Sequence, residues 1–204
     1  MSAPERSRKE AKRETRAALI RAGLAAFAEE GLDAPSLDAI CARAGYTRGA
    51  FYVHFAGREE FVVAVMESVL GEFLDAILGA DSEGADLERT IRRFADALVE
   101  GNPVTGAPGS MRTHQLIDVC CRSPRIRERF LAMLAEAQRR IERAALAGQR
   151  AGVVRKDVAA HSVAAMLVTL AMGVVQMYEL GAPLSPDEVR TTVARVLTTS
   201  RGDA

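Results

Sequence analysis

Residues 37–55 read LDAICARAGYTRGAFYVHF, and the pattern of this stretch predicts a specific helical motif. Ser36 stands directly before it as a side-chain cap, and Gly45 ends a first short helix about two turns later. Thr47 is placed to cap a second short helix, which carries Phe51 and, near its end, Phe55. Two short helices joined through a tight glycine-containing turn form a helix-turn-helix, so the sequence predicts this motif.

A longer amphipathic helix is expected before the motif, over residues 12–30, with Gly31 as its C-cap. Its apolar residues recur at helical spacing and mark one buried stripe: Leu19 or Ile20, Leu24 and Phe27. After the motif, Gly57 interrupts the pattern and a fourth helix is expected over 58–78. The sequence therefore predicts a three-helix domain over residues 1–57.

The remainder, residues 58–204, is expected to be a larger helical domain. Ala, Leu, Arg and Glu dominate the composition and Trp is absent, which favours helices over sheets. The polar stretch 79–84 predicts a connector, and the glycines and prolines of 101–109 predict a loop. Further helices are expected over 87–100, 110–121, 123–151, 157–180 and 185–199. The predicted fold class is thus all-α, with an N-terminal helix-turn-helix domain followed by a larger helical domain.

Charge is balanced over the chain but not at its beginning. Lys and Arg together number 27, as do Asp and Glu, whereas residues 1–21 hold seven basic and three acidic side chains. A local basic segment in a neutral protein indicates a confined nucleic-acid surface. The charged N-terminus has no apolar signal core, and the longest apolar stretch contains His161, Gln176 and Glu179. We therefore expect a soluble, cytoplasmic protein with no membrane partner.

The motif residues, Leu37 to Phe55 followed by Arg58-Glu59-Glu60-Phe61, closely resemble the DNA-binding segment of TetR-family regulators. The resemblance extends back through Thr15, Ile20, Ala22, Phe27 and Gly31, and more weakly forward to 148–152, Asp157 and Gly173. It implies a dimeric regulator that binds double-stranded operator DNA and responds to a small apolar or amphipathic molecule. The direction of control that it implies is repression, relieved by the effector.

The resemblance also implies which residues contact DNA. The N-terminus of a recognition helix offers free N–H groups and a positive dipole end to phosphates or base edges. The implied contacts are Thr15, Ser36, Thr47, Arg48, Gly49, Tyr52, His54 and Arg58. Arg48 is expected to reach a base or phosphate, and Gly49 to permit close approach. Because Val53 stands where many relatives carry a larger polar or aromatic side chain, DNA shape is expected to contribute more to recognition.

An effector pocket is expected among the middle helices. Five of the seven methionines fall between residues 111 and 177, where flexible thioethers suit variable ligands or, alternatively, simply fill the core. His114, Gln115 and Tyr178 are the candidate polar anchors of a mostly aliphatic cavity. The full set of expected ligand-binding residues is Phe94, Met111, His114, Gln115, Met133, Met166 and Tyr178.

Two C-terminal helices, 157–180 and 185–199, are expected from the resemblance to form the homodimer interface. Small and polar residues recur at 3–4 spacing along the first of them and form one stripe that lets a partner helix approach: Ala165, Thr169, Gly173 and Gln176. The alternative is that the same stripe packs within one chain.

A second hypothesis gives the C-terminal domain a protein partner or a reactive thiol at Cys120 or Cys121, whose neighbours include Arg122 and Arg125. The three cysteines are expected to be reduced, and Cys41 to be core. His114 and Asp118 stand at i, i+4, but no further ligand accompanies them, so neither a metal site nor a cofactor is expected. No phosphate loop and no nucleophilic triad context occurs in the sequence, which predicts that the protein is not an enzyme.

Overall fold

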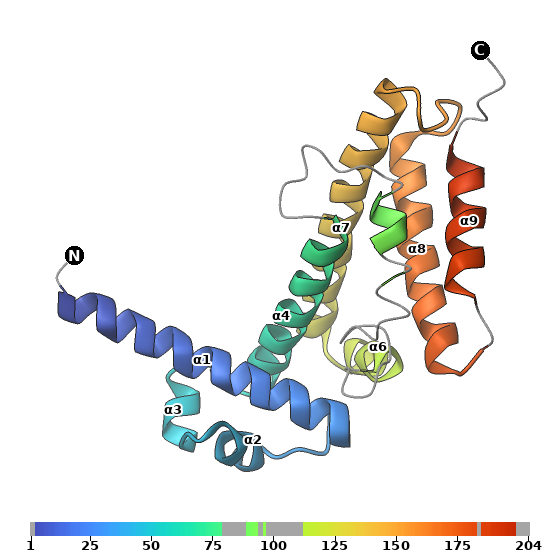
Figure 1. The fold of residues 1–204 in the computed structure, drawn as a ribbon. Helices are drawn as coiled ribbons and strands as arrows, with labels where there is room; N and C mark the ends of the chain where they lie inside the picture. Colours follow the sequence, from blue (N-terminus) through green and yellow to red (C-terminus); the bar gives the residue numbers. More distant parts are fainter. Residues whose placement is uncertain (1–2, 79–88, 94–95, 97–111, 183–184, 199–204) are drawn as a thin grey trace.

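The computed structural model describes residues 3–78, 89–93, 96, 112–182 and 185–198. Within these residues the chain is helical and carries no strand, which confirms the all-α prediction; an isolated bridge joins Val154 to Thr198. The helices are α1 (Ala3–Glu30), α2 (Leu37–Ala44), α3 (Arg48–Tyr52), α4 (Arg58–Leu78), α6 (Thr113–Arg122), α7 (Pro124–Arg150), α8 (Ala160–Glu179) and α9 (Pro186–Leu197) (Figure 1).

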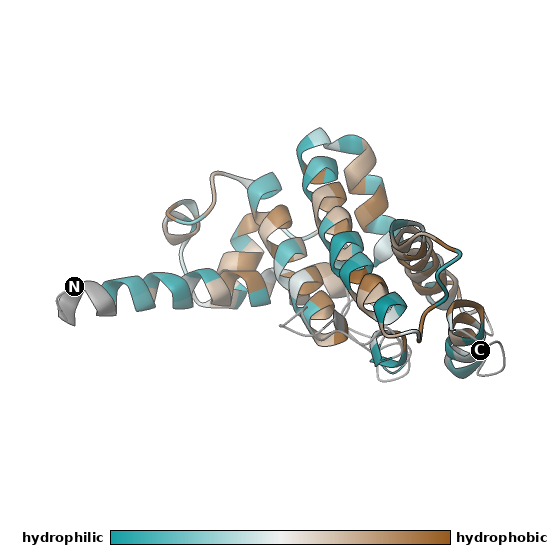
Figure 2. Cartoon of the chain, turned by 90° about the horizontal axis from the view of Figure 1, so that it is seen from above, coloured by the Kyte–Doolittle hydropathy of each residue, from teal (hydrophilic) through white to brown (hydrophobic). Residues whose placement is uncertain are grey.

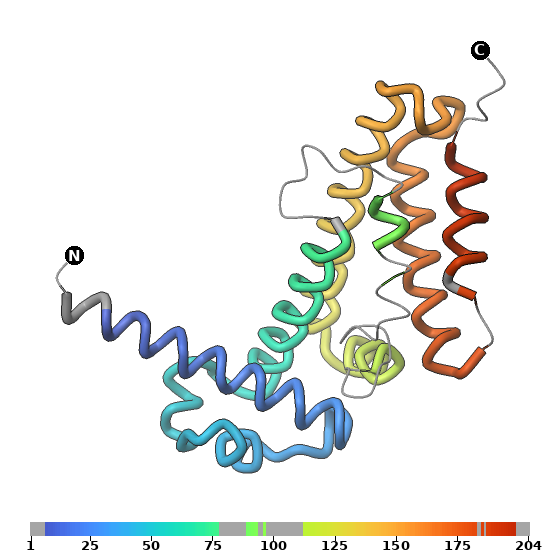
Figure 3. Tube along the Cα trace, in the orientation of Figure 1, coloured from blue at the N-terminus to red at the C-terminus, as the bar shows by residue number. Residues whose placement is uncertain are grey.

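The helices form two connected groups (Figure 1). Helices α2 and α3 lie against α1 at one end of the molecule, and the tube in Figure 3 shows this small group clearly. Helix α4 leaves the group and runs beside α7, which in turn packs along α8, with α9 on the outer side. Helix α6 sits where the two groups meet, in contact with α7 and α8.

The expected caps form as the sequence predicts. The Ser36 hydroxyl accepts a hydrogen bond from the Ala39 N–H at 3.1 Å, and the Thr47 hydroxyl accepts one from the Ala50 N–H at 3.2 Å. Gly45 ends α2 with a left-handed backbone (φ 77°). Helix α3 ends at Tyr52, three residues before Phe55, so it is shorter than expected.

Helix α1 begins at Ala3, well before the expected start at residue 12. Charged residues are frequent in this added part, and Figure 2 shows the coloured turns of the helix there as mostly hydrophilic and extending away from the rest of the molecule. Because Lys, Arg and Glu favour helix, the first helix continues through the basic segment rather than beginning after it.

Four phenylalanines form the core of the N-terminal group. The rings of Phe27, Phe51 and Phe55 all lie against Phe61, with centroids 6.0, 5.2 and 5.0 Å away in mostly edge-on arrangements. All four side chains are fully buried. Because Phe61 belongs to α4, the first half of α4 shares the core of α1–α3, and the boundary expected at 57/58 separates two parts that pack together.

The second half of α4 belongs to another core. Phe73 and Ile77 pack there with Ile141 of α7, and residues of α8 and α9 complete it: Val163, Ala164, Val193 and Leu197. Expectations for residues 79–84, for 101–109 and for most of a helix over 87–100 fall outside the described residues, apart from a helical segment at 89–93.

Replacing Gly23 of α1 by alanine is expected to destabilise the fold, because the added Cβ would lie 2.4 Å from Phe61 Cζ in this tightly packed core. We expect a loss of about 1–3 kcal/mol in urea unfolding followed by circular dichroism. Gly71→Ala is the matched control, since Gly71 lies within α4 with nothing near its Cβ position. That change should stabilise the protein by about 0.5–1 kcal/mol. Equal effects at both positions would contradict the close approach of α1 to α4.

Candidate nucleic-acid interface and apolar cavity

The helix-turn-helix presents one exposed polar surface. Ser36, Thr47, Arg48, Gly49 and Tyr52 are all exposed, and all lie at or near the starts of α2 and α3 or along α3. The two capping hydroxyls use an oxygen lone pair to accept their cap bonds, so each O–H remains able to donate to a phosphate. The surface therefore combines hydroxyl donors, one guanidinium and a glycine that leaves room for close approach.

Arg48 is held by two neighbours. Its Nη1 lies 3.2 and 3.4 Å from the two carboxylate oxygens of Asp38, and its Nη2 donates to the Tyr52 hydroxyl at 3.4 Å. The guanidinium carbon also lies 5.8 Å from the centre of the Tyr52 ring, a cation–π distance. The hydrogen bond to Tyr52 and the charge of Asp38 both raise the pKa of Arg48.

His54 lies half-buried beside this surface, and its ring centroid is 6.2 Å from that of Phe55. Burial lowers the pKa of His54 from 6.5, and the positive charges of Lys12 and Arg16 lower it further. His54 is therefore mainly neutral at pH 7, and a contact to phosphate would use its neutral N–H.

Lys12 and Arg16 belong to the basic N-terminal segment noted in the sequence, but neither was assigned a DNA contact there. Lys12 and Arg16 stand one turn apart on α1, and Arg16 lies over the Phe55 ring at 5.3 Å. The basic part of α1 thus reaches the end of the recognition element. The signal in the sequence was the excess of basic residues in the first 21 positions.

In two further residues expected to contact DNA, Thr15 and Arg58, the side-chain donors bind backbone carbonyls of the chain. Thr15 lies in the middle of α1 rather than near its start, and its hydroxyl donates to the Ala11 carbonyl at 2.9 Å. Arg58 donates to the carbonyls of Pro35 and Leu32 at 2.6 and 2.5 Å. Its guanidinium therefore fastens the start of α4 to the loop before α2, a structural role that the sequence did not indicate. The phosphate contacts expected for Thr15 and Arg58 stay predictions.

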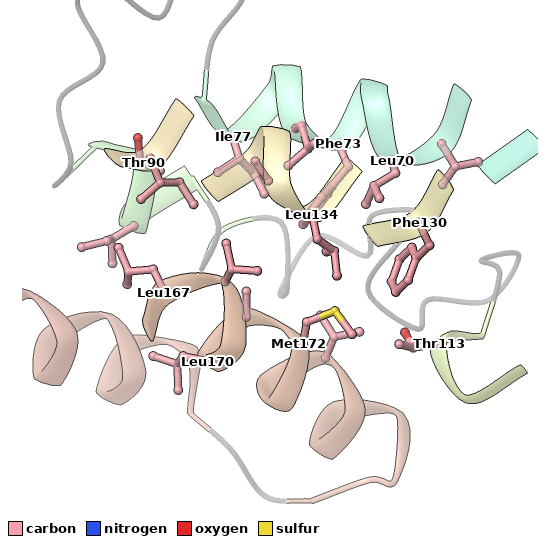
Figure 4. A pocket seen from close by; sticks show the side chains of 18 of the residues that line it. Leu70, Phe73, Ile77, Thr90, Thr113, Phe130, Leu134, Leu167, Leu170 and Met172 are labelled. Carbon is pink, nitrogen blue, oxygen red and sulfur yellow. The ribbon is translucent and has the colours of Figure 1, made fainter. Parts of the chain in front are cut away.

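An apolar cavity of about 150 Å³ lies between α4, α7, α8 and α9 (Figure 4). Aliphatic side chains, two phenylalanines and two methionines make up most of its wall, including Leu70, Phe73, Phe130, Leu134, Leu167 and Met172. The polar residues among the described lining are Thr90, Thr113 and Arg190. Such a wall accommodates an apolar molecule with few hydrogen-bonding groups.

The five expected ligand-binding residues that the structure describes do not line this cavity. His114, Met166 and Tyr178 are exposed at the protein surface, and Met133 packs into the core shared by α4 and α7. Gln115 lies against Gly31 instead. Phe94 and Met111 are outside the described residues. The prediction that these five residues line the cavity was wrong because it relied on residue type alone. Which side chains face the cavity depends on the orientation of α6, α7 and α8 about their own axes.

Helix α6 connects the cavity to the N-terminal group. Thr113 and Leu116 line the cavity. Gln115 faces the other way, with its amide nitrogen 3.0 Å from the position that a Gly31 Cβ would occupy. Gly31 also has φ 89°, so a side chain is disfavoured there both by the backbone conformation and by this contact.

Two polar contacts strengthen the same junction. Arg122, at the end of α6, donates to Asp33 at 2.6 Å across 89 positions of sequence. Ser123, which caps α7, donates to Glu59 of α4 at 2.6 Å. Both contacts join the C-terminal half of the chain to the loop and helix that surround the helix-turn-helix.

The cysteines differ in exposure. Cys41 and Cys120 are buried, and burial is the main cause of the raised pKa of both thiols, whereas Cys121 is exposed. A raised pKa lowers the thiolate fraction that reacts with oxidants and electrophiles, so Cys120 is suited to packing. Within the described part of the chain, no cluster of three potential metal ligands occurs; His114 instead lies 3.4 Å from Glu179.

Helix α8 carries an exposed face along most of its length. Thr169 and Gly173 of the predicted stripe are exposed, and Ala165 and Gln176 are half-buried. Met166 and Met177 flank them with 41% and 46% of their surface accessible. By length and composition α8 could cross a membrane, yet one face of it packs within the helical bundle against α7. In the single chain the stripe is therefore exposed at its middle two residues and half-buried at Ala165 and Gln176.

Two family descriptions match the sequence. "Bacterial regulatory proteins, tetR family" matches residues 19–65, and "Tetracyclin repressor-like, C-terminal domain" matches residues 87–193, which is more than half of the chain. Over 56 residues the chain is 45% identical to the uncharacterized HTH-type transcriptional regulator TtgW of Pseudomonas putida. That alignment covers 28% of this chain and 42% of the relative, so the chain spans less than half of the relative's length.

Two solved structures share the fold over nearly the whole chain. The reduced form of Escherichia coli NemR has a TM-score of 0.75 at 17% identity and covers 93% of this chain and 99% of its own. The SmeT–triclosan complex, whose protein is a repressor from Stenotrophomonas maltophilia, has a TM-score of 0.71 at 24% identity and covers 93% and 94%. All of these matches are to regulators rather than to enzymes. On its motif, its fold and these matches, the chain belongs to the TetR family of bacterial transcriptional regulators.

Proposed function

We propose that this protein is a cytoplasmic homodimeric repressor that leaves its operator when a small apolar or amphipathic molecule fills its cavity. Residues 1–57 would bind DNA, and residues 58–204 would sense the effector and pair the subunits. The observation that carries the proposal is the position of the apolar cavity, whose wall shares residues with the core beneath the helix-turn-helix.

The DNA-binding half of the proposal rests on the exposed surface of α2 and α3. Arg48 is the exposed basic side chain of α3, and its guanidinium can form the bidentate contact with guanine that is common in major-groove recognition. Ser36, Thr47, Tyr52 and His54 would position the helix on phosphates, and Lys12 and Arg16 would add positive charge from α1. Phosphate contacts fix orientation, whereas the base contact specifies sequence.

The chemistry of the cavity supports an effector with a predominantly apolar surface. Hydroxyls of Thr90 and Thr113 can orient one or two polar groups, and Arg190 stands in the wall as the charged residue among its described lining. Arg190 donates to Asp187 at 3.0 Å on the same helix, so its charge is already partly matched.

Coupling between the two halves would run through shared side chains. Met66, Leu116 and Phe130 line the cavity and also belong to the core that contains the four N-terminal phenylalanines. Packed cores transmit small displacements because they have little free volume. An effector that pushes these three residues apart would tilt α4 and α6, and with them the contacts that join the two groups of helices. The spacing of the two recognition helices in the dimer would change.

Dimerisation rests on the exposed face of α8 and on α9. A two-fold interface pairs identical surfaces, and small residues let two helices approach closely. Gly173 has nothing within 4 Å of its Cβ position in the single chain, so a partner helix could approach it closely. Exposed apolar residues continue the face at Met166, Met177 and Val196.

Arg48→Ala should lower sequence preference at one operator position while leaving the fold and the dimer intact, because Arg48 and its partner Asp38 are both exposed. One bidentate base contact contributes about 1–3 kcal/mol of discrimination. Gel-shift titrations against a duplex selected by the wild-type protein from a randomised library would measure the loss. Arg139→Ala on α7 is the control and should bind as the wild type does. Unchanged preference in Arg48→Ala would exclude Arg48 from base recognition.

Ala137→Phe should block effector binding without weakening DNA binding. Ala137 is 4% exposed and lines the cavity, so a phenyl ring there occupies the space that an effector needs. We expect affinity for the apolar fluorescent probe N-phenylnaphthylamine to fall at least about tenfold, a loss of at least about 1.4 kcal/mol. Ala132→Phe adds the same ring at an exposed site on α7 and serves as the control. Equal probe binding by both variants would place the effector elsewhere.

Gly173→Arg should dissociate the dimer without unfolding the monomer, because the arginine has free space in a single chain but would place an unpaired charge between two. Light scattering should report the monomer mass while circular dichroism remains helical, and operator affinity should fall. Ala132→Arg is the exposed control on α7. A Gly173→Arg protein that remains dimeric and binds its operator would show that this face of α8 lies outside the interface.

A further inference from the structure

An acidic side chain stands within the surface proposed to face DNA. Asp38 lies in the first turn of α2, two residues after Ser36 and within hydrogen-bonding distance of Arg48. A carboxylate in this position repels phosphates, so it weakens DNA binding unless it has another effect on the complex. A negative charge at the start of α2 also stabilises that helix through its dipole, by an amount that does not depend on Arg48.

The contacts of Arg48 indicate how Asp38 can affect the complex with DNA. Asp38 approaches Nη1 from α2, and Tyr52 approaches Nη2 and the guanidinium face from within α3. Arginine has five N–H donors in a rigid planar fork. Among the described residues, no partner other than Asp38 and Tyr52 is found for this fork, so its Nε–H and further Nη hydrogens remain available to a ligand.

An arginine without such contacts samples many rotamers, and it loses that freedom when it binds a base. A free arginine can also turn toward whichever phosphate is nearest, which gives affinity without sequence information. Both effects lower the discrimination that an arginine provides. Contacts that orient the guanidinium before DNA arrives would reduce both.

We propose that Asp38 is a positioning residue for Arg48, holding one edge of the guanidinium so that the remaining edge is presented to a base. Asp38 then increases sequence discrimination at one operator position while lowering affinity for DNA in general. This inference rests on the proposed role of Arg48 in base recognition.

The test compares Asp38→Asn with the wild type for binding to the library-selected duplex, to the same duplex changed at each position, and to an unrelated duplex. We expect Asp38→Asn to bind unrelated DNA more tightly and to lose about fivefold or more of its discrimination at one position. In the Arg48→Ala background, Asp38→Asn should leave discrimination unchanged, because the group it orients is gone. Full discrimination in Asp38→Asn would overturn the proposal.

Glu29→Gln is the matched control. Glu29 forms an exposed ion pair with Arg43 at 2.5 Å in the same domain, so this substitution removes the same charge without touching Arg48. It should leave discrimination unchanged, and a loss equal to that of Asp38→Asn would overturn the proposal by assigning the effect to net charge.

Asp38→Glu separates positioning from helix stabilisation, because it keeps the charge in the first turn but moves the carboxylate. If Asp38 positions Arg48, the Asp38→Glu protein should keep the thermal stability of the wild type but discriminate less between operator sequences. An Asp38→Glu protein that discriminates as well as the wild type would overturn the proposal. Failure of Arg48→Ala to alter base preference would instead refute the proposed function of Arg48, and the two failures are therefore distinguishable.

Discussion

The packing of Phe61 against the N-terminal phenylalanines holds the recognition element in place and joins it to the other half of the molecule. Helices α2 and α3 are short, and helices of this length are marginal in isolation, so they require a packed surface to hold them. Phe51 and Phe55 provide that surface from α3 and the turn after it, and Phe61 provides it from α4. The orientation of the recognition element is thus fixed by a helix that continues into the C-terminal bundle.

This arrangement explains how the two halves of the chain can be connected without a large polar interface. Helix α4 contributes to one core with its first half and to the other with its second half. Met66 lies between them, fully buried and in the wall of the cavity. The hydrogen bonds of Arg122 to Asp33 and of Ser123 to Glu59 also join the two halves. Arg58 fastens the start of α4 to the loop before α2.

Most of the secondary structure and the helix-turn-helix could be predicted from the sequence alone. Local signals are sufficient for these features, because the caps at Ser36 and Thr47 and the glycine at position 45 act within a few residues of their own position. Proline at 124 and at 186 likewise marked the starts of α7 and α9. The end of α3 and the start of the first helix were not predicted correctly, and for the first helix the reason is that a charged segment gives no apolar periodicity from which to fix its beginning.

Which side chains face the cavity, and which fasten the two halves together, became clear only from the packing of the helices. Gln115 and Arg58 have the polar character of ligand contacts, yet one lies against Gly31 and the other binds two backbone carbonyls. The wall of the cavity is made largely of ordinary core residues such as Leu134 and Leu167, which have no distinguishing local pattern. Their role depends on the rotation of each helix about its axis, which is set by contacts between segments far apart in the sequence.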